Sequence, residues 1–277
     1  MKTVLLPSGE QVPALGQGTW FMGEDASARA EEIATLREGV ELGLSLIDTA
    51  EMYGEGSAEK LVGQAITGLR DKVFLVSKVY PHNATRKGTL AACERSLRRL
   101  GTDHLDLYLL HWRGRVAFEE TLDALVELQT AGKIRYFGVS NLDLEDMQEF
   151  CATPHGNRVA TNQLLYNLSR RGIEWDLLPW CRQQKIPVMA YSPIEQARLL
   201  HHPALITMGQ RHGLTAAQLA LGWLLAKDDI IAIPKSGKRS HVRENAAVLA
   251  RPPSSELLAE LDLVFPPPQR AYPLEML

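Results

Sequence analysis

Short runs of apolar residues alternate with longer amphipathic stretches along most of the chain. The apolar runs have the length of strands and are almost continuously hydrophobic, which is typical of parallel strands covered on both faces. They lie at residues 14–20, 44–48, 73–78, 105–111, 134–140, 159–163, 187–192 and 230–235. Ahead of them, residues 4–13 predict two short strands joined by a turn at Ser8 and Gly9.

The stretches between these runs have the spacing of amphipathic helices. They lie at residues 28–42, 57–69, 89–100, 118–131, 142–151, 175–184, 215–226 and 241–249, and a last helix is predicted near 255–263. Ser57 is expected to cap its helix, because a hydroxyl accepts from free N–H groups of the first turn. Gly101 and Gly132 suit helix C-termini, where the left-handed conformation favours glycine.

Eight strand–helix units in sequence predict a (β/α)8 TIM barrel that follows a short N-terminal β-hairpin. A doubly wound open sheet is the alternative, because alternation alone does not show that a sheet closes. We expect a single domain over residues 1–277. The proline-rich segments at 252–253 and 266–268 border the last helix and do not form a linker.

Composition narrows the class of protein further. Apolar residues make up 45% and charged residues 23% of the chain, and the formal net charge is −3, so neither disorder nor a nucleic-acid partner is expected. No apolar run approaches the roughly 18 residues of a membrane helix. The apolar part of the N-terminus, residues 1–6 before Pro7, is too short for the hydrophobic region of a signal peptide. Cys93, Cys151 and Cys181 form no CxxC pair or disulfide framework. We expect a cytoplasmic protein with no membrane contact, and a monomer.

Nearly every predicted strand ends in a reactive or hydrogen-bonding side chain. The carboxyl ends of barrel strands form one rim, and active sites lie there. The residues are Thr19, Trp20, Asp48, Lys78, His111, Ser140, Asn141, Gln163, Tyr191, Ser192, Lys235 and Ser236. Each side chain could merely cap a loop, but eight polar strand ends together indicate one polar pocket.

Four side chains of this region suit proton transfer to oxygen. Tyr53 follows Asp48 by five residues, and a Lys78 ammonium beside its phenol should lower the phenol pKa from about 10. A phenol tuned in this way can protonate a developing alkoxide. Asp48 would keep Lys78 protonated, and His111 would orient a carbonyl. Side chains cannot supply a hydride, so carbonyl reduction implies a cofactor. No HExxH motif or i,i+4 histidine pair predicts a metal.

At these residues the chain resembles the aldo-keto reductase family. Family-like segments occur in family order at residues 43–54, 77–78, 106–112, 132–141, 190–193 and 233–236. Among bacterial members the chain is most similar to small methylglyoxal-reductase-like enzymes, through residues 16–20 and 48–53. The resemblance implies a barrel that binds NADPH without a Rossmann domain. In agreement, Gly16 and Gly18 lack the third glycine of a dinucleotide fingerprint.

The resemblance also implies roles for individual residues. Asp48, Tyr53, Lys78 and His111 would form a catalytic tetrad, with Tyr53 as the general acid in reduction. Around the nicotinamide, Ser140, Asn141 and Gln163 would bind the carboxamide, and Tyr191 would stack on the ring beside Ser192. Thr19 and Asp48 would reach the neighbouring ribose. At the other end of the cofactor, Lys235 and Ser236 would bind the 2′-phosphate, and Glu244 and Asn245 would contact the adenine. His241 stands where many members carry a phosphate-binding arginine, and an imidazole binds phosphate less well. Tyr191 as a packed core residue and Asn141 as a helix cap are the alternatives.

The nearest walls of a substrate pocket would be Trp20, Tyr53, His111 and Trp112, although both tryptophans could serve packing alone. The short connection at 113–117 and the short tail after the last helix leave little chain for a lid. We therefore expect broad use of small aldehydes and ketoaldehydes such as methylglyoxal. A nicotinamide-binding redox-sensing or regulatory barrel with little turnover, and a metal-dependent barrel hydrolase, are the alternatives.

Overall fold

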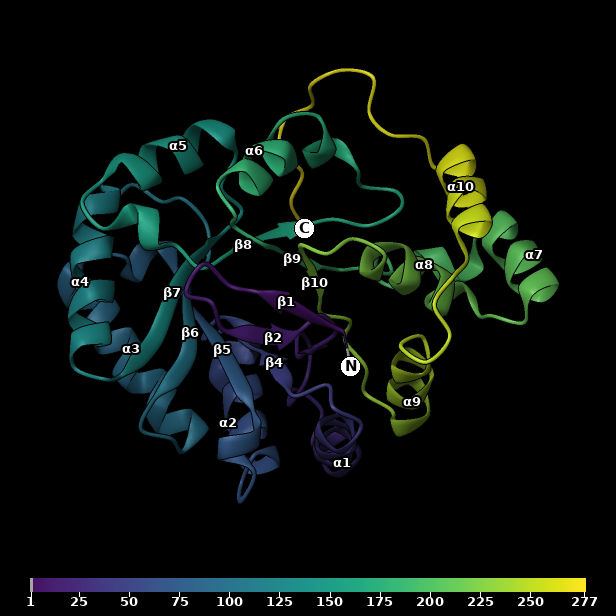
Figure 1. Cartoon of the computed structure of the whole chain (residues 1–277). Helices are drawn as coiled ribbons and strands as arrows, with labels where there is room; N and C mark the ends of the chain where they lie inside the picture. Colours follow the sequence, from purple (N-terminus) through teal and green to yellow (C-terminus); the bar gives the residue numbers. More distant parts are fainter. Residues whose placement is uncertain (1) are drawn as a thin grey trace.

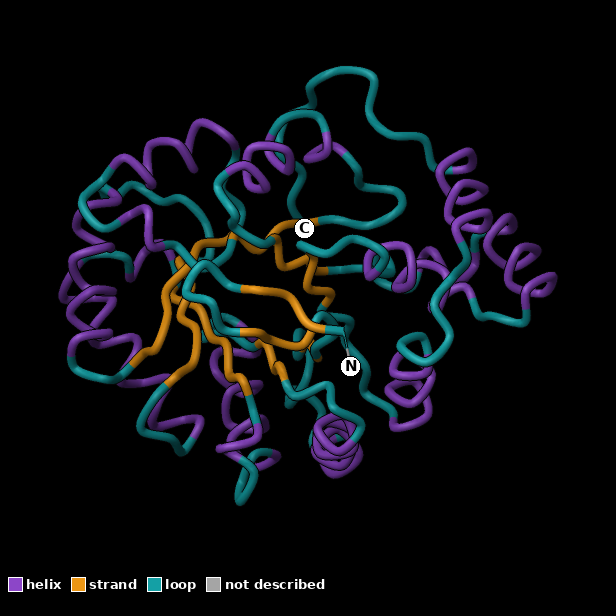
Figure 2. The backbone as a smooth tube through the Cα atoms, in the orientation of Figure 1, coloured by secondary structure: helices purple, strands orange, loops and turns teal. Residues whose placement is uncertain are grey.

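The computed structural model describes residues 2–277. Its centre is a sheet of eight parallel strands that pair in sequence order (Figure 1). The strands are β3 (Gln17–Gly18), β4 (Leu46–Asp48), β5 (Phe74–Val79), β6 (Leu105–Leu110), β7 (Ile134–Ser140), β8 (Asn162–Leu165), β9 (Val188–Tyr191) and β10 (Ile230–Ala232). Figure 2 shows these strands curving around a common centre with helices outside them. All eight predicted strands are present.

The sheet closes between its first and last strands. Gly16 N–H donates to the Ala232 carbonyl at 2.9 Å, and Gly18 N–H donates to the Pro234 carbonyl at 3.0 Å. A Cβ atom on Gly18 would lie only 2.8 Å from the Ile233 carbonyl oxygen, so this seam requires glycine. The predicted (β/α)8 barrel is confirmed, and the alternative of an open doubly wound sheet is wrong.

Eight helices follow the strands and cover the barrel. They are α1 (Arg29–Glu41), α2 (Ser57–Ala65), α3 (Arg86–Leu100), α4 (Phe118–Thr130), α5 (Leu144–Ala152), α6 (Leu177–Gln183), α8 (Ala216–Leu225) and α9 (Arg239–Ala247). The predicted last helix is α10 (Ser255–Val264). The sequence patterns missed α7 (Pro203–His212). Gly209 within it lowers helix propensity, and a Cβ there would lie 2.4 Å from the Leu214 carbonyl oxygen.

The helix ends agree with the predictions at two positions and differ at one. Gly101 ends α3 with φ +64°, and Gly132 follows α4 with φ +71°. Ser57 does not cap α2. The cap position is Gly56, with φ +88°, and Ser57 already has helical angles. The reason is a tight turn at Tyr53–Gly56, which leads directly into the helix.

The predicted N-terminal hairpin is also present, and it covers the amino-terminal end of the barrel. β1 (Thr3–Leu5) and β2 (Gln11–Pro13) pair antiparallel. Val4 and Val12 are buried in the hydrophobic core. The hairpin therefore leaves the carboxyl end of the strands free for a functional site.

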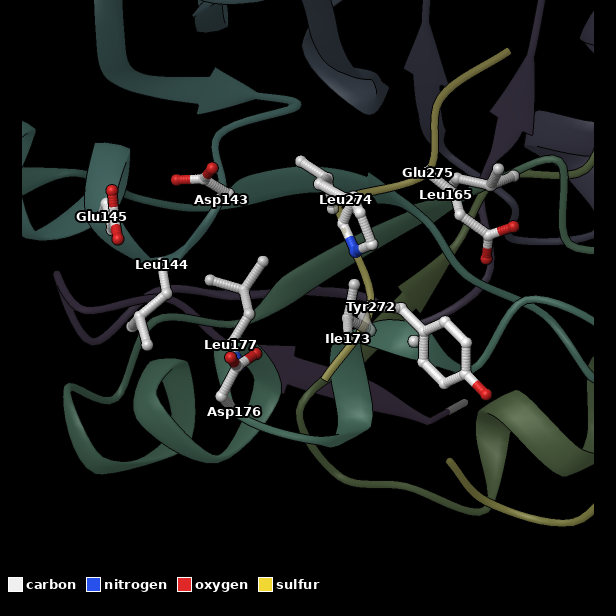
Figure 3. Close-up of a pocket in the computed structure, with 12 residues that line it drawn as sticks. Asp143, Leu144, Glu145, Leu165, Ile173, Asp176, Leu177, Tyr272, Leu274 and Glu275 are labelled. Atoms are coloured by element: carbon white, nitrogen blue, oxygen red, sulfur yellow. The ribbon is translucent and has the colours of Figure 1, made fainter. Parts of the chain in front are cut away.

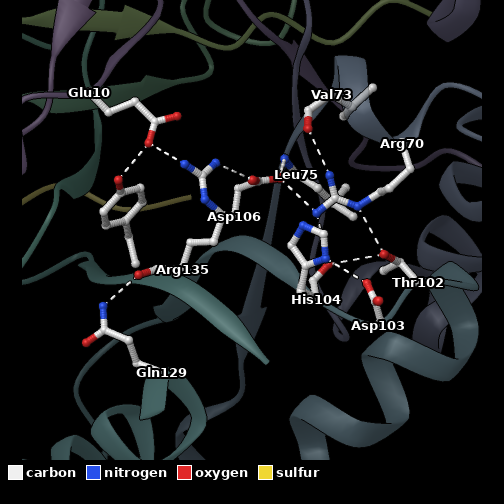
Figure 4. Close-up of polar contacts among 11 residues, drawn as sticks. Glu10, Arg70, Val73, Leu75, Thr102, Asp103, His104, Asp106, Gln129 and Arg135 are labelled. Carbon is white, nitrogen blue, oxygen red and sulfur yellow. Dashed lines mark hydrogen bonds and ion pairs between the residues drawn. The ribbon is translucent and has the colours of Figure 1, made fainter. Parts of the chain in front are cut away.

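A polar network fastens this hairpin to the barrel (Figure 4). Glu10 accepts hydrogen bonds from Arg135 at 2.5 Å and from the Tyr136 hydroxyl at 2.6 Å. Arg135 also pairs with the buried Asp106 at 2.7 Å, and Arg70 pairs with Asp106 at 2.9 Å. Each buried charge in this network has a partner of opposite sign, which is what a structural role requires.

Candidate active site

A buried ion pair lies inside the carboxyl end of the barrel. Lys78 is in β5 and Asp48 ends the neighbouring strand β4. The Lys78 Nζ atom lies 2.8 Å from Asp48 Oδ2 and 3.2 Å from the Tyr53 hydroxyl. The Lys78 side chain is 0% exposed and Asp48 only 3%. The structure therefore brings Lys78 against Asp48 and Tyr53, from which it is separated by 30 and 25 residues in sequence.

The loop after β4 places Tyr53 over this ion pair. Gly54 and Glu55 adopt left-handed angles, with φ +54° and +52°, and they fold the chain back in a tight turn. Lys78 Nζ lies 4.8 Å from the centre of the Tyr53 ring. The phenol is consequently held between the ammonium and a cavity.

The acidity of Tyr53 differs from the prediction. Burial raises the pKa of Tyr53 well above its ordinary value, and the negative charge of Asp48 raises it further. Burial also lowers the pKa of Lys78, although Asp48 opposes this shift. The expectation that Lys78 acidifies Tyr53 is wrong for this state of the site. Because Asp48 already neutralises the ammonium, Tyr53 stays a protonated phenol at neutral pH, with a proton to give.

His111 completes the group at the end of β6. Its ring centre lies 5.9 Å from that of Tyr53. Burial and the Lys78 charge place the pKa of His111 well below its ordinary value, so the imidazole is neutral. Its buried Nδ1 has no hydrogen-bond partner within residues 2–277. A bare nitrogen there costs less than an unpaired N–H, which favours the proton on Nε2 and a donor for the cavity.

This depressed pKa predicts a pH dependence of stability. In the unfolded chain His111 binds a proton below about pH 6.5, while in the folded chain it stays neutral to a lower pH. The free energy of unfolding should therefore fall as pH falls below about 6.5, by up to ~1.4 kcal/mol per pH unit for this one group. Urea unfolding of wild type and His111→Gln between pH 5 and pH 8 measures it. A difference between the two proteins that does not change with pH would contradict the assignment.

Polar side chains from β7, β8 and β9 form a chain of hydrogen bonds beside the ion pair. Gln163 donates to Asp48 Oδ1 at 2.8 Å, and Ser140 donates to the Gln163 carbonyl at 2.9 Å. Asn141 donates to the Ser140 hydroxyl at 3.1 Å and accepts from the Tyr191 hydroxyl at 2.9 Å. These residues thus form one connected wall.

The contacts of Asn141 contradict its role as a helix cap, and those of Tyr191 combine packing with exposure to open space. Asn141 has φ +55° and its side chain joins this wall. Asp143, not Asn141, caps α5 by accepting from Asp146 N–H at 2.9 Å. Tyr191 is half-buried: it packs against the core and also lines both the hollows described below.

Two hollows meet at this wall. The first, which we call the inner cavity, has a volume of about 200 Å³ and is lined by Trp20, Met52, Tyr53, His111, Trp112, Ser140, Asn141, Gln163, Tyr191, Met276 and Leu277. The second, the side cleft, has a volume of about 380 Å³. It is lined by Gly18, Thr19, Trp20, Phe21, Asp48, Tyr53, Tyr191, Ser192, Pro193, Ile194, Gln196, Ala197, Ile233 and Lys235. Tyr53 borders both, so a small molecule in one hollow and a larger one in the other would meet at its hydroxyl.

Comparison with known proteins identifies this arrangement. Residues 14–264 match the model of the Aldo/keto reductase family. The chain belongs to this family. Among its relatives, Methylglyoxal reductase YeaE from Escherichia coli (strain K12) is 55% identical over 280 residues, which cover 99% of each chain. Glyoxal reductase from Bacillus subtilis (strain 168) is 33% identical, over 94% of this chain and 91% of the relative.

Solved structures agree with this assignment. A crystal structure of an aldo/keto reductase from Klebsiella pneumoniae in complex with NADP and acetate superimposes with a TM-score of 0.97. It is 53% identical, and the alignment covers 100% of this chain and 99% of that chain. The family resemblance expected from the sequence is confirmed.

Other predicted cofactor contacts of this aldo/keto reductase lie around or beyond the side cleft. Lys235 is exposed at its edge. Four further predicted residues do not line the cleft. Ser236 and Asn245 are buried, and a 3.2 Å hydrogen bond joins their side chains. His241 is exposed, and Glu244 is half-buried. Thr19 lines the cleft, but its hydroxyl donates to the Asp48 carbonyl at 2.9 Å and so also fixes the end of β4.

Several wall residues of this aldo/keto reductase were not among those predicted from its sequence. Phe21 lines the side cleft and stacks on Trp20, with ring centres 4.4 Å apart. Met52, Met276 and Leu277 line the inner cavity. Little chain was expected to remain for a lid, but the tail reaches the inner cavity without forming a helix or strand. No periodic pattern marks such a segment.

Within residues 2–277, no group of three or more His, Cys, Asp or Glu side chains is arranged to hold an ion. In the same part of the chain, no helix is long and apolar enough to cross a membrane.

Proposed function

We propose that this aldo/keto reductase reduces small aldehydes and ketoaldehydes, such as methylglyoxal, to alcohols, with NADPH as the reductant. The observation that carries this proposal is the contact between Lys78 and Tyr53 at the wall shared by both hollows. The full-length similarity to a methylglyoxal reductase and to a reductase crystallised with NADP supports it.

The residues along the two hollows fit a nicotinamide cofactor. Gln163 is buried and uses its amide nitrogen on Asp48, which leaves its side-chain oxygen free to accept from a carboxamide. Asn141 Oδ1 accepts from the Tyr191 hydroxyl and keeps a second lone pair, with which it can accept from the same carboxamide. When bound, NADPH supplies the hydride. Tyr191 would hold the nicotinamide ring, and Lys235 the 2′-phosphate.

The proton would come from Tyr53. Its protonated hydroxyl faces the inner cavity and can transfer H⁺ to the developing alkoxide. Lys78, 3.2 Å away, would stabilise the phenolate that remains, while Asp48 aims the ammonium. The Nε2–H of His111 would donate to the carbonyl oxygen and polarise it.

Size and surface chemistry of the inner cavity support small carbonyl substrates. Its walls are mostly aromatic or apolar, and about 200 Å³ suits a compact molecule better than an extended one. We also infer a cytoplasmic location, which the free, buried Cys93 and Cys181 support. The monomeric state stays a prediction.

The regulatory-barrel alternative is not favoured, because Asp48, Tyr53, Lys78 and His111 are together and poised for proton transfer. The direct test follows NADPH absorbance with a panel of aldehydes, ketones and ketoaldehydes, repeated with NADH. We expect turnover of methylglyoxal with NADPH and no loss of activity after chelation. NADPH binding without turnover of any carbonyl would support the regulatory barrel. Activity that depends on NADPH and survives chelation would exclude the metal-dependent hydrolase.

Lys235→Ala should discriminate between the two nicotinamide cofactors. Removing the ammonium should weaken NADPH binding roughly 10- to 100-fold, the worth of a hydrogen bond to a charged group, and leave NADH binding nearly unchanged. Fluorescence titration with each cofactor measures both dissociation constants. Lys60→Ala, at an exposed position of α2, serves as the control. Equal weakening of both cofactors would contradict the 2′-phosphate assignment.

A further inference from the structure

The C-terminal tail, residues 266–277, reaches the inner cavity with few attachments. Within the described chain, no backbone–backbone hydrogen bond involves these residues. Leu274 packs against the core, and Glu275 pairs with Arg170 at 2.6 Å. The placement of Met276 and Leu277 in the cavity therefore depends on a small number of side chains.

A hollow beneath the tail makes this dependence stronger. It has a volume of about 200 Å³. Figure 3 shows Tyr272, Leu274 and Glu275 along one side of it and Asp143 and Asp176 on the other. Along this hollow the tail residues 272–275 face open space on one side, although Leu274 packs against the core. The ion pair with Arg170 is its main polar anchor.

Arg170 is itself held by a second carboxylate. Its Nε and Nη2 atoms lie 3.0 and 2.9 Å from Oε1 of Glu195. Glu195 is only 4% exposed. Its other oxygen accepts from Asn167 at 2.8 Å, and the same Asn167 amide donates to the Ser192 carbonyl at 2.9 Å. The guanidinium fork thus bridges a buried carboxylate and the tail, a geometry that the single ammonium of lysine cannot reproduce.

Glu195 belongs to a segment that borders the side cleft, residues 192–198, which we call the strap. Ser192, Gln196 and Ala197 line the cleft. Glu195, Gln196 and Ala197 have φ values of +50°, +50° and +70°, which L-residues rarely adopt. Such a conformation persists only where its surroundings hold it. Here the donors around the Glu195 carboxylate provide that support.

We propose that Arg170 is a positioning residue that ties the strap beside the cofactor cleft to the tail over the carbonyl cavity. The proposal rests on the proposed function, because it places the cofactor along the side cleft with its nicotinamide at the inner cavity, and the carbonyl in the inner cavity. With Arg170 anchored on Glu195, its Nη1 is in place to hold Glu275, and the tail closes the cavity around a small substrate. Loosening the strap therefore also loosens the tail, and carbonyl binding is coupled to the state of the strap.

Two isosteric variants test the bridge from its two ends. Glu275→Gln removes the tail's charge at a half-exposed site and should raise the KM for methylglyoxal roughly 3- to 10-fold. Its kcat should be nearly unchanged, because lost uniform binding raises KM alone. Its dissociation constant for NADPH should stay within about twofold of wild type. Glu195→Gln should weaken NADPH binding and, at saturating NADPH, should also raise the KM for methylglyoxal.

The double variant gives the decisive result. With Arg170 no longer anchored, adding Glu275→Gln to Glu195→Gln should raise KM little further. The matched control is Glu260→Gln, which removes the charge from an exposed 2.6 Å ion pair with Arg211 outside the tail. Combined with Glu195→Gln, its effect on KM should be the same as in the wild-type background. Two results would overturn the proposal. One is a KM for the double variant that equals the product of the two single-variant increases, and the other is a wild-type KM for Glu195→Gln at saturating NADPH.

Two further measurements keep the test decisive. If Glu195→Gln fails to fold by circular dichroism, Arg170→Lys takes its place and should raise KM as Glu275→Gln does; a wild-type KM would overturn the proposal. Wild-type turnover separates the two levels of inference. If the wild-type protein does not reduce methylglyoxal with NADPH, the proposed function is refuted. If the wild-type protein does so but Glu275→Gln changes KM no more than Glu260→Gln, only the role of Arg170 is refuted.

Discussion

Replacing Tyr53 by phenylalanine is expected to lower kcat for methylglyoxal reduction roughly 10²- to 10⁴-fold, the usual worth of general acid catalysis. The change removes one oxygen and keeps the ring between Lys78 and the inner cavity. Burial keeps the pKa of this phenol high, so it is protonated and is assigned here as the donor. No other hydroxyl contacts the Lys78 ammonium within residues 2–277. Stopped-flow measurement of NADPH oxidation gives the rate of the chemical step.

Cofactor binding supplies the control for this prediction. NADPH should bind Tyr53→Phe with nearly wild-type affinity, because the hydroxyl is assigned to the carbonyl. Tyr80→Phe is the matched variant, since the Tyr80 ring lies 6.4 Å from that of His111, and it should retain turnover. A collapse of NADPH affinity in Tyr53→Phe would show that the two sites are not separate, and a wild-type rate would favour the regulatory barrel.

Lys78→Met should remove both turnover and stability. The substitution leaves the Asp48 carboxylate buried, with Gln163 as its remaining side-chain donor. Breaking a buried ion pair from one side costs about 3–5 kcal/mol of unfolding free energy. Turnover should be abolished, because no cation remains to stabilise the Tyr53 phenolate. Urea unfolding and steady-state kinetics measure the two effects.

The double variant Asp48→Asn/Lys78→Met separates these effects. Removing both charges should return most of the lost stability, because no uncompensated charge stays buried. Activity should stay absent, since the ammonium is still missing. A double variant no more stable than Lys78→Met would refute the account of the uncompensated carboxylate. Recovered turnover would refute the role of Lys78.

The sequence patterns predicted the elements of the barrel because the strands are local apolar runs with a clear period. They did not predict how the barrel closes, because the seam depends on hydrogen bonds between residues near 16 and residues near 232. Gly16 and Gly18 look like a fragment of a phosphate-binding motif in sequence. In the structure they allow two backbones to approach each other closely.

The candidate site divides in the same way. The sequence alone determined which chemistry-bearing residues end the strands, since a strand places its last side chain on the rim whatever its neighbours are. The tertiary structure decided the protonation of Tyr53, because burial and the charge of Asp48 outweigh a neutralised Lys78. It also decided that Met276 and Leu277 border the inner cavity. Charge compensation and the course of an irregular tail depend on contacts between distant segments, and no local pattern of residues records them.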